Sequence, residues 1–332
     1  MNEFVLLFIS GQGVLVWNWL TGKCHAKLDS VMPGAIAEAI LLQRTAFMVF
    51  RQVENTPKLE LYTFSAKEPT SDEPPPILRA VFFLPSLQEG VEMNMQCRCN
   101  PPPFEYAHLV HPDMSSIPID PPCYLRRPFR IQETSRIVVL MLTVRSEFDT
   151  EQIRDLAIIV PLQTFIFANL DPEAPQGDPR VLPAAEWMRS SQVLAGIPLS
   201  DQWVYGTRFA TLSPDQNLCI CDFNPATIAY LKHHQESNRS EDRPKGVQGV
   251  QSMDDEEIIE WKAGNADVGL VLRGADITDE IFFKDPLRGR IPFLMSISEE
   301  NFDLAPNESQ GVMIDDERVL IVRVCGFNFV HE

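Results

Sequence analysis

Two apolar runs open the chain and are separated by a short loop that contains glycine. The first run covers Phe4–Ile9, and the second, Val14–Gly22, carries two tryptophans and ends in a Thr-Gly turn signal. Apolar runs of this length, joined by a short glycine-bearing loop, are typical of a β-hairpin. The sequence therefore predicts a hairpin at the start of the chain.

Short apolar or alternating runs continue along most of the sequence, with turn signals between them. In Leu59–Phe64 apolar and polar residues alternate, which places one face in a core and the other in solvent. The run Gly34–Arg44 fits either a helical face or a buried strand, and we favour the strand because its surroundings are rich in strands. The further predicted strands are Cys24–Leu28, Ala46–Arg51, Lys58–Phe64, Ile77–Leu84, Val91–Arg98, Ser135–Glu147, Leu156–Ala168, Gln202–Leu212, Asn217–Phe223, Glu257–Trp261, Asp267–Leu272, Arg290–Ile297, Gly311–Ile314 and Arg318–Phe329.

Two segments depart from this pattern. Asn224 is a favoured N-cap, Pro225 suits the first helical position, and Ile228 and Leu231 begin an apolar stripe, so a short helix is predicted there. Residues 235–257 contain almost no large apolar side chain and end in four acidic residues. Such a segment cannot bury enough surface to offset its ordering entropy, so we predict a disordered, mobile surface insertion.

The number of strands favours one fold class. About twenty short strands with one short helix exceed what a β-sandwich uses, whereas radial repetition of four-stranded sheets needs roughly 40 to 50 residues per blade. We therefore predict an all-β chain, a single propeller-like domain over residues 1–332. It would be a degenerate β-propeller of about six or seven blades with an incomplete first blade. An internal repeat agrees with this: in both Val16–Trp19 and Ile220–Phe223 a small polar residue precedes the large residue that ends the strand.

Charge and cysteine usage narrow the class of partner and the compartment. Acidic residues outnumber basic ones 46 to 28, which gives a formal charge of −18. A surface this negative repels phosphate backbones, so no nucleic-acid partner is expected. No apolar run approaches the roughly 18 to 20 residues of a membrane-spanning helix, so no membrane partner is expected either. The seven cysteines, an odd number, and the lack of a basic leader indicate free thiols in the cytoplasm or nucleus.

One group of residues has the composition of a zinc site. Cys97 and Cys99 are followed by His108, His111 and Cys123, which together supply enough ligand types for zinc. The Cys-x-Cys spacing is shorter than the usual zinc knuckle. Moreover, alternate residues of a strand point the same way. We therefore favour packing of the two thiols in a core over metal binding.

Other motifs also favour structure over catalysis. Cys219 and Cys221 repeat the Cys-x-Cys spacing within a predicted core strand, and the acidic residues 315–317 fit a turn that leads into a strand. Neither a Gly-x-Ser-x-Gly elbow nor a Gly-x-x-x-x-Gly-Lys phosphate loop occurs. We expect no catalytic residue, no cofactor and no metal, and the sequence singles out no binding residue.

The tryptophans allow two interpretations. A buried tryptophan contributes a large apolar area to a core, and an exposed one is a frequent anchor of protein interfaces. We favour core packing, and keep one or two interface anchors as the alternative. The residues concerned are Trp17, Trp19, Trp187, Trp203 and Trp261.

Several segments resemble known proteins. The strand and turn Val16–Gly22 resemble the end of a WD-type propeller repeat, in which a strand finishing in Trp-Asp is followed by a Thr-Gly turn. Four other segments, in this order along the chain, are similar to the C-terminal regions of basidiomycete fungal F-box proteins. These segments are Tyr205–Phe209, Asp222–Pro225, Phe283–Pro286 leading to Ile291–Phe293, and Met313–Val319.

The resemblance implies a function as well as a fold. It implies a WD-like propeller that presents a surface for binding other proteins, in the manner of a ubiquitin-ligase substrate receptor. No F-box occurs within this chain, so the ligase adaptor is expected as a partner only if an F-box lies upstream, and the chain is otherwise a truncated relative. We expect a non-catalytic protein-interaction module and not an enzyme. The alternative is a propeller-fold hydrolase with a carboxylate or metal site in its central channel.

Overall fold

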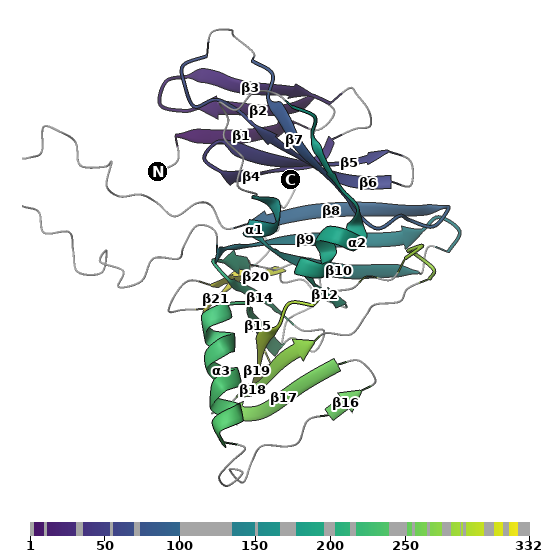
Figure 1. Cartoon of the computed structure of the whole chain (residues 1–332), viewed down its shortest axis with the longest axis vertical. Coiled ribbons are helices and arrows are strands. Elements are labelled where there is room, and N and C mark those ends of the chain that lie inside the picture. Colours follow the sequence, from purple (N-terminus) through teal and green to yellow (C-terminus); the bar gives the residue numbers. More distant parts are fainter. Residues whose placement is uncertain are drawn as a thin grey trace, which may run out of the picture.

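The computed structural model arranges the chain as a row of β-sheets (Figure 1). None of the helices in the described part of the chain is long and apolar enough to span a membrane. The described residues are 3–9, 12–30, 36–53, 56–69, 74–99, 135–149, 152–166, 177–195, 203–212, 217–238, 251–253, 256–263, 266–273, 280–285, 287, 290–301, 309–314 and 319–324.

The first sheet contains the predicted opening hairpin, which is confirmed. Strands β1 (Phe4–Ile9), β2 (Gly13–Asn18) and β3 (Lys23–Asp29) pair as an antiparallel meander. Gly13 has a φ of 133°, and a Cβ at this position would lie 2.1 Å from the carbonyl oxygen of Leu28. Only glycine fits both the backbone angle and the close approach of β3.

The second and third sheets form the middle of the row. The second is a meander of β4–β7 with β11 added parallel to β7, and the third has the order β12-β10-β9-β8. The strands are β4 (Ile36–Gln43), β5 (Ala46–Val53), β6 (Thr56–Thr63), β7 (Ile77–Phe83), β8 (Val91–Cys99), β9 (Ile137–Ser146), β10 (Ile153–Pro161), β11 (Arg180–Leu182) and β12 (Gln192–Ala195), and the short helices beside them are α1 (Leu162–Phe165), α2 (Ala184–Trp187) and η5 (Met188–Ser190).

The fourth sheet is the widest and follows the third in sequence. Its order is β13-β14-β15-β19-β18-β17-β16, and helix α3 (Pro225–Asn238) packs Ile228 against Leu270 of this sheet. A separate pair, β20 and β21, follows. The strands are β13 (Trp203–Tyr205), β14 (Arg208–Leu212), β15 (Asn217–Asp222), β16 (Gln251–Met253), β17 (Glu256–Ala263), β18 (Ala266–Arg273), β19 (Phe293–Asn301), β20 (Ser309–Ile314) and β21 (Val319–Val324).

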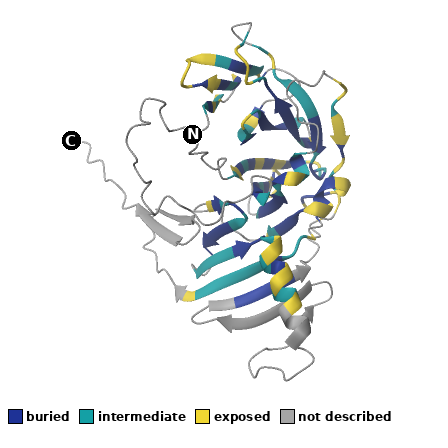
Figure 2. Ribbon diagram, turned by 60° about the vertical axis from the view of Figure 1, so that its left-hand side comes forward, coloured by how far each residue is buried: buried dark blue, intermediate teal, exposed yellow. Residues whose placement is uncertain are grey.

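A hydrophobic core fills each space between consecutive sheets. Because side chains of a strand alternate between its faces, β5 directs Phe47 towards the first sheet and Phe50 towards the third. In the same way, Leu140 of β9 faces the second sheet, and Val139 faces the fourth. Figure 2 shows buried residues throughout these middle sheets. Both of their faces are buried, so their strands are apolar almost without interruption.

The first strands of the sheets lie side by side. β1 contacts β4, β4 contacts β8, and β8 contacts β13, while β20 contacts β13 and β14. The sheets are therefore stacked in chain order with their first strands along one side of the row. No closed barrel or ring is formed within the described residues, so the predicted number of blades stays a prediction.

The internal repeat found in the sequence has a structural basis. The Oδ1 atom of Asn18 accepts a hydrogen bond from the backbone N–H of Leu20 at 3.0 Å, and Oδ1 of Asp222 accepts one from Asn224 at 2.9 Å. Each polar side chain therefore forms an Asx-type turn that ends its strand. The next backbone N–H groups are equivalent too: Trp19 bonds to the carbonyl of Glu3 at 3.0 Å, and Phe223 to that of Thr207 at 2.9 Å.

Several sequence predictions need correction. The single strand predicted over residues 202–212 is divided into β13 and β14 by a turn at Gly206, where φ is 59°. The strand predicted over 156–168 ends at Pro161, where α1 follows, so the expectation of one short helix is wrong. Of the predicted insertion 235–257, the first residues continue α3 and residues 251–253 form β16. Residues 239–250 and 325–329 lie outside the described residues.

A long connection between β18 and β19 crosses back to the middle of the row. We call its described residues 280–285, 287, 290 and 291 the crossover. Phe283 is buried in the core between the second and third sheets and pairs with Leu87 in an isolated antiparallel bridge. The backbone N–H of Lys284 donates to the carbonyl of Ser86 at 3.0 Å. The crossover thereby ties the fourth sheet to the connection between β7 and β8.

Replacement of Phe283 by alanine is expected to destabilise the protein by about 3–5 kcal/mol, because it leaves a cavity where the crossover enters the core. Ile281→Ala is the matched control, since Ile281 is 54% exposed and its loss should change stability by less than about 0.5 kcal/mol. Urea unfolding followed by tryptophan fluorescence measures both. Equal effects of the two substitutions would show that the crossover is not anchored by Phe283.

Candidate functional site

A buried group of charged residues lies in the second sheet. The side chains of Arg51 and Glu60 are 1% and 5% exposed, and Nε of Arg51 lies 2.8 Å from Oε2 of Glu60. Lys58 lies 2.8 Å from the other carboxylate oxygen, and the hydroxyl of Tyr62 donates to Oε2 at 2.8 Å. Every partner of the carboxylate comes from β5 or β6, so the strand register alone assembles the group.

The electrostatics of this group are those of a closed ion-pair network. Burial by itself raises the pKa of Glu60, but hydrogen bonds from Lys58 and Tyr62 and the charges of Lys58 and Arg51 outweigh it, so that the pKa lies below its usual range. Burial and the neighbouring Glu60 carboxylate raise the pKa of Tyr62. The carboxylate is occupied by its partners, and we assign the group a structural role.

The cysteines of the predicted zinc group lie against a core. Cys97 is buried between the second and third sheets, and Cys99 packs against the same core from the next inward-facing position of β8. Burial raises the pKa of Cys97 well above its usual range and that of Cys99 to about 11. The thiols share one face of the strand, as expected. His108, His111 and Cys123 lie outside the described residues, and among those described no three potential metal ligands gather.

The second Cys-x-Cys pair is likewise part of a core. Cys221 is buried between the third and fourth sheets, and Cys219 packs against the same cluster. A hydrogen bond to Cys219, together with burial, raises the pKa of the Cys221 thiol. The same hydrogen bond lowers the pKa of the Cys219 thiol. Cys97 and Cys99, whose pKa values are raised, lack the features of a reactive thiol. The acidic residues 315–317 lie outside the described part of the chain.

The first sheet leaves an apolar face uncovered. Val5, Leu7 and Ile9 of β1 are 38%, 40% and 41% exposed, and Trp17 of β2, which is opposite Val5 in the register, is 40% exposed. We call these four side chains the outer face of the first sheet. The alternate residues of the same strands are buried against the second sheet. Trp19 and Leu20 follow at the turn and are 43% and 64% exposed.

The tryptophans whose side chains the structure describes fall into two groups, and the side chain of Trp261 lies outside that description. Trp187 is buried and donates from Nε1 to the carbonyl of Phe83 at 2.8 Å, which agrees with core packing. Trp17 and Trp19 are substantially exposed, and so is Trp203 in β13. The interpretation that all five are core residues is wrong for these three. The residues around these exposed tryptophans follow the same apolar pattern as those of buried strands. Only the structure therefore distinguishes exposed from buried tryptophans.

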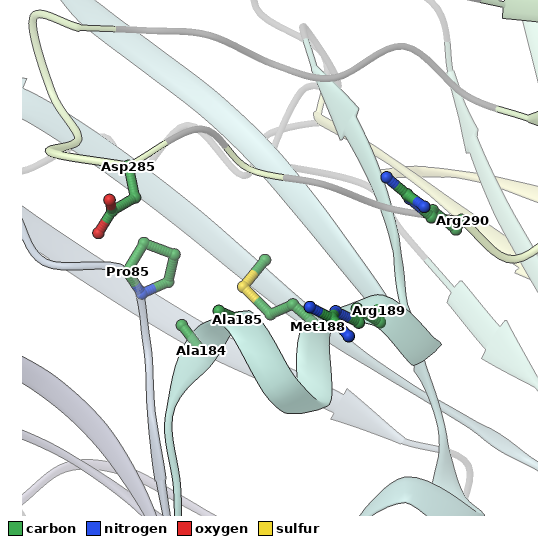
Figure 3. Close-up of a pocket in the computed structure, with 7 residues that line it drawn as sticks. All are labelled: Pro85, Ala184, Ala185, Met188, Arg189, Asp285 and Arg290. Carbon is green, nitrogen blue, oxygen red and sulfur yellow. The ribbon is translucent and has the colours of Figure 1, made fainter.

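A pocket lies where three connections of the row meet. Its cavity of about 590 Å³ is bounded by Pro85 after β7, by α2 and η5, and by the crossover (Figure 3). Met188 and the two alanines of α2 form an apolar floor with Pro85. Asp285 and the guanidinium groups of Arg189 and Arg290 form charged walls, with Asp285 at the opposite end from the arginines in Figure 3. We call this the Met188 pocket.

Backbone hydrogen bonds hold the walls of the Met188 pocket in place. The N–H of Arg290 donates to the carbonyl of Ser191 at 2.7 Å, and the hydroxyl of the fully buried Ser191 donates to the carbonyl of Met188 at 2.7 Å. The N–H of Lys284 fixes the opposite wall on Ser86. A pocket built this way is pre-formed, which reduces the entropic cost of binding a ligand.

Sequence reasoning did not single out either surface. Residues of the Met188 pocket come from positions 85, 184, 185, 188, 189, 285 and 290, which only the tertiary structure brings together. One signal was present: Phe283–Pro286, leading to Ile291–Phe293, is among the segments that carry the F-box protein resemblance, and it coincides with the crossover. Its buried phenylalanines explain its apolar half, and Asp285 belongs to the pocket.

Glu60→Gln is expected to lower the free energy of unfolding by about 3–5 kcal/mol at neutral pH, because it leaves buried Arg51 without its countercharge. Since the pKa of Glu60 is lowered on folding, the wild-type advantage should be complete above the ordinary carboxyl range and shrink as pH falls through the lowered pKa. Urea unfolding at several pH values measures this difference.

The exposed pair of Glu92 and Arg145 supplies the control for that experiment. Glu92→Gln should cost less than about 1 kcal/mol at any pH, because solvent screens an exposed pair. A pH-independent difference between wild type and Glu60→Gln would contradict the assigned ionisation of Glu60.

Cys97 and Cys99 should resist alkylation by iodoacetamide in the native protein at mildly alkaline pH, because both thiols are protonated and the core shields Cys97 fully and Cys99 in part. Both should react fully in urea. Peptide mass spectrometry of the alkylated protein measures the two states. Rapid native modification of either residue would contradict the packing seen in β8.

Comparison with known proteins adds no information on function, so the functional argument rests on the geometry of the described residues. Neither a scan against models of protein families nor a search of curated proteins finds a match for this chain. The resemblance to fungal F-box proteins therefore stays a prediction from the sequence segments named above.

Proposed function

We propose that this chain is a non-catalytic protein-interaction module that binds a partner protein through the outer face of the first sheet. The exposed Trp17, together with Val5, Leu7 and Ile9, carries the proposal. Contiguous exposed apolar side chains mark interaction sites, and tryptophan is enriched among the residues that dominate binding energy. Trp19 and Leu20 extend this surface to the turn after β2.

We further propose that the scaffold is a WD-like propeller of about six or seven blades. Three features support it. The first three sheets are built mainly as meanders that follow one another in the chain, the first strands β1, β4, β8 and β13 of the four sheets lie side by side, and Asn18 and Asp222 end equivalent strands with the same turn. Radially arranged sheets have these properties, because each repeat contacts its neighbours through the same strands.

The proposed occupant of the outer face is another protein whose apolar surface is bordered by basic residues. The formal charge of −18 favours a cationic partner and opposes association with a second copy of the chain. Strand β20 contacts β13 and β14, in the fourth sheet, and the first sheet lies at the other end of the row. These two observations argue against the same chain as occupant.

The narrower form of the proposal is a substrate receptor of an F-box-type ubiquitin ligase. It rests on the four segments that resemble fungal F-box proteins and requires an F-box upstream of Met1. Full-length transcript sequencing tests for that F-box. If the longer form, purified by affinity, never retains the ligase adaptor, the receptor role is wrong, although the binding role of the outer face is unaffected.

A photo-crosslinking amino acid placed at Leu7 should join the chain to one cationic partner in cells of the source organism. The purified partner should then bind wild-type protein, and Trp17→Ser with Trp19→Ser should weaken that binding at least tenfold, because truncated interface tryptophans typically cost about 2 kcal/mol or more. Isothermal titration calorimetry measures the affinity.

Phe148 provides the control position, since it is 80% exposed and lies just after β9, which belongs to a different sheet. The same photo-crosslinker at Phe148 should not capture that partner. Crosslinks of the Leu7 variant only to a second copy, or only within its own chain, would overturn the proposal. So would unchanged partner affinity in the double tryptophan variant.

A further inference from the structure

Two arginines of this acidic protein stand out because their guanidinium groups have no partner among the residues that the structure describes. Among the arginines whose side chains the structure describes, only Arg189 and Arg290 have neither an ion pair nor a side-chain hydrogen bond. Arg51, Arg145 and Arg208, for comparison, each lie within 3.4 Å of a carboxylate oxygen. Both unpaired arginines line the Met188 pocket.

The position of both arginines in one pocket is informative because acidic residues are in large excess in this chain. With 46 acidic and 28 basic residues, an exposed arginine has many carboxylates available to it, and most described arginines have found one or another acceptor. Two unpaired guanidinium groups in one pocket therefore leave an uncompensated positive field at that point. Guanidinium groups bind carboxylates in a planar, bidentate geometry, so such a field favours an oxyanion.

The rest of the pocket defines what accompanies the anion. Pro85, Ala184, Ala185 and Met188 present an apolar floor, and methionine adapts its shape to varied apolar side chains. Asp285 stands at the far end, away from the arginines, and its carboxylate has no ion pair among the described residues (Figure 3). From one end to the other the pocket is therefore cationic, apolar and anionic.

We propose that the Met188 pocket binds a peptide segment that carries a carboxylate side chain, one or more apolar side chains and a basic side chain, in that spatial order. The carboxylate would pair with Arg189 and Arg290, the apolar side chain would cover Met188, and the basic group would pair with Asp285. Each charged group of the pocket then gains a partner that the described part of the chain does not give it.

A free inorganic anion is a poorer match for this site. It would use only the two arginines and would leave the apolar floor and Asp285 without contact. A peptide uses all three regions, and the pre-formed walls on Ser86 and Ser191 reduce the ordering cost of binding it. The pocket lies at the junction of the second and third sheets with the crossover, separate from the outer face of the first sheet.

Only the choice of a peptide as the ligand rests on the proposed function, because peptides are the ligands that an interaction module binds. The test uses the whole purified chain and defined peptides. Its outcome is thus independent of whether the outer face binds a partner protein.

The probes are fluorescein-labelled, end-capped peptides in which glutamate and lysine are separated by one, two or three leucines. Fluorescence anisotropy should show saturable binding for at least one spacing. Replacement of the peptide's glutamate by glutamine, or of its leucines by serines, should weaken that binding by about tenfold, because each removes one of the proposed contacts. Inorganic phosphate at equal concentration should not displace the peptide.

Variants of the protein assign the contacts to residues. Arg189→Gln and Arg290→Gln should each weaken binding of the glutamate peptide about tenfold and leave binding of the glutamine peptide unchanged. Asp285→Asn should weaken binding of the peptide that contains lysine. It should not weaken binding of a peptide in which leucine replaces that lysine. Arg145→Gln, which removes the same charge from the exposed pair with Glu92, is the matched control and should bind as wild type does.

Several results would overturn the proposal. Absence of saturable binding for every spacing at millimolar peptide is one of them. Equal affinity for the glutamate and glutamine peptides is another, and so is equal weakening by Arg145→Gln and Arg189→Gln, which would indicate a general charge effect. Circular dichroism of each variant verifies that the fold is kept. If Arg290→Gln unfolds the protein, the binding measured with Arg189→Gln alone decides whether the proposal is correct.

Discussion

The structure depends on one constraint: successive side chains of a strand point to opposite faces, so a sheet whose two faces are both apolar must be covered on both. β5 and β9 have such sequences, and each sheet in the middle of the row packs between two others. Stacking in chain order follows from this, because consecutive meanders joined by short connections are the nearest available neighbours. The first sheet obeys the same pattern but has a neighbour on one face only. Its outer face is exposed for that reason, and the proposed binding role begins there.

Several polar side chains within these stacked apolar sheets have specific structural roles. Glu60 accepts from Arg51, Lys58 and Tyr62, so a buried carboxylate is fully paired within two neighbouring strands. Asn18 and Asp222 stop their strands by turning the backbone at equivalent points of distant sheets. These groups are saturated by the protein itself. The arginines of the Met188 pocket are not, and this contrast distinguishes a structural polar group from one available to a ligand.

The two proposed surfaces have different physical characters, which suits an interaction module. The outer face of the first sheet is apolar and formed by neighbouring strands, so it favours extended contact with another protein. The Met188 pocket is small and charged at both ends, so it favours a short, ordered sequence of side chains. The crossover connects the fourth sheet to this pocket through Phe283, and the shape of the pocket therefore depends on the packing of three sheets.

Local patterns were sufficient for most strands. Apolar runs bounded by Gly, Pro and Asx residues predicted the opening hairpin and the strands near residues 46–64, 77–98 and 135–147, because these signals act within a few residues. The same patterns missed α1, α2 and the short strands β11 and β12, which are too brief to show a period. Nor could they separate exposed Trp17 from buried Trp187, or join residues 85, 188 and 290 in one pocket. The sequence by itself determined the all-β class and the alternation of faces, since both are local properties of the chain. Which face remained uncovered, and which arginines remained unpaired, was decided by tertiary structure alone, because both depend on contacts between segments far apart in sequence.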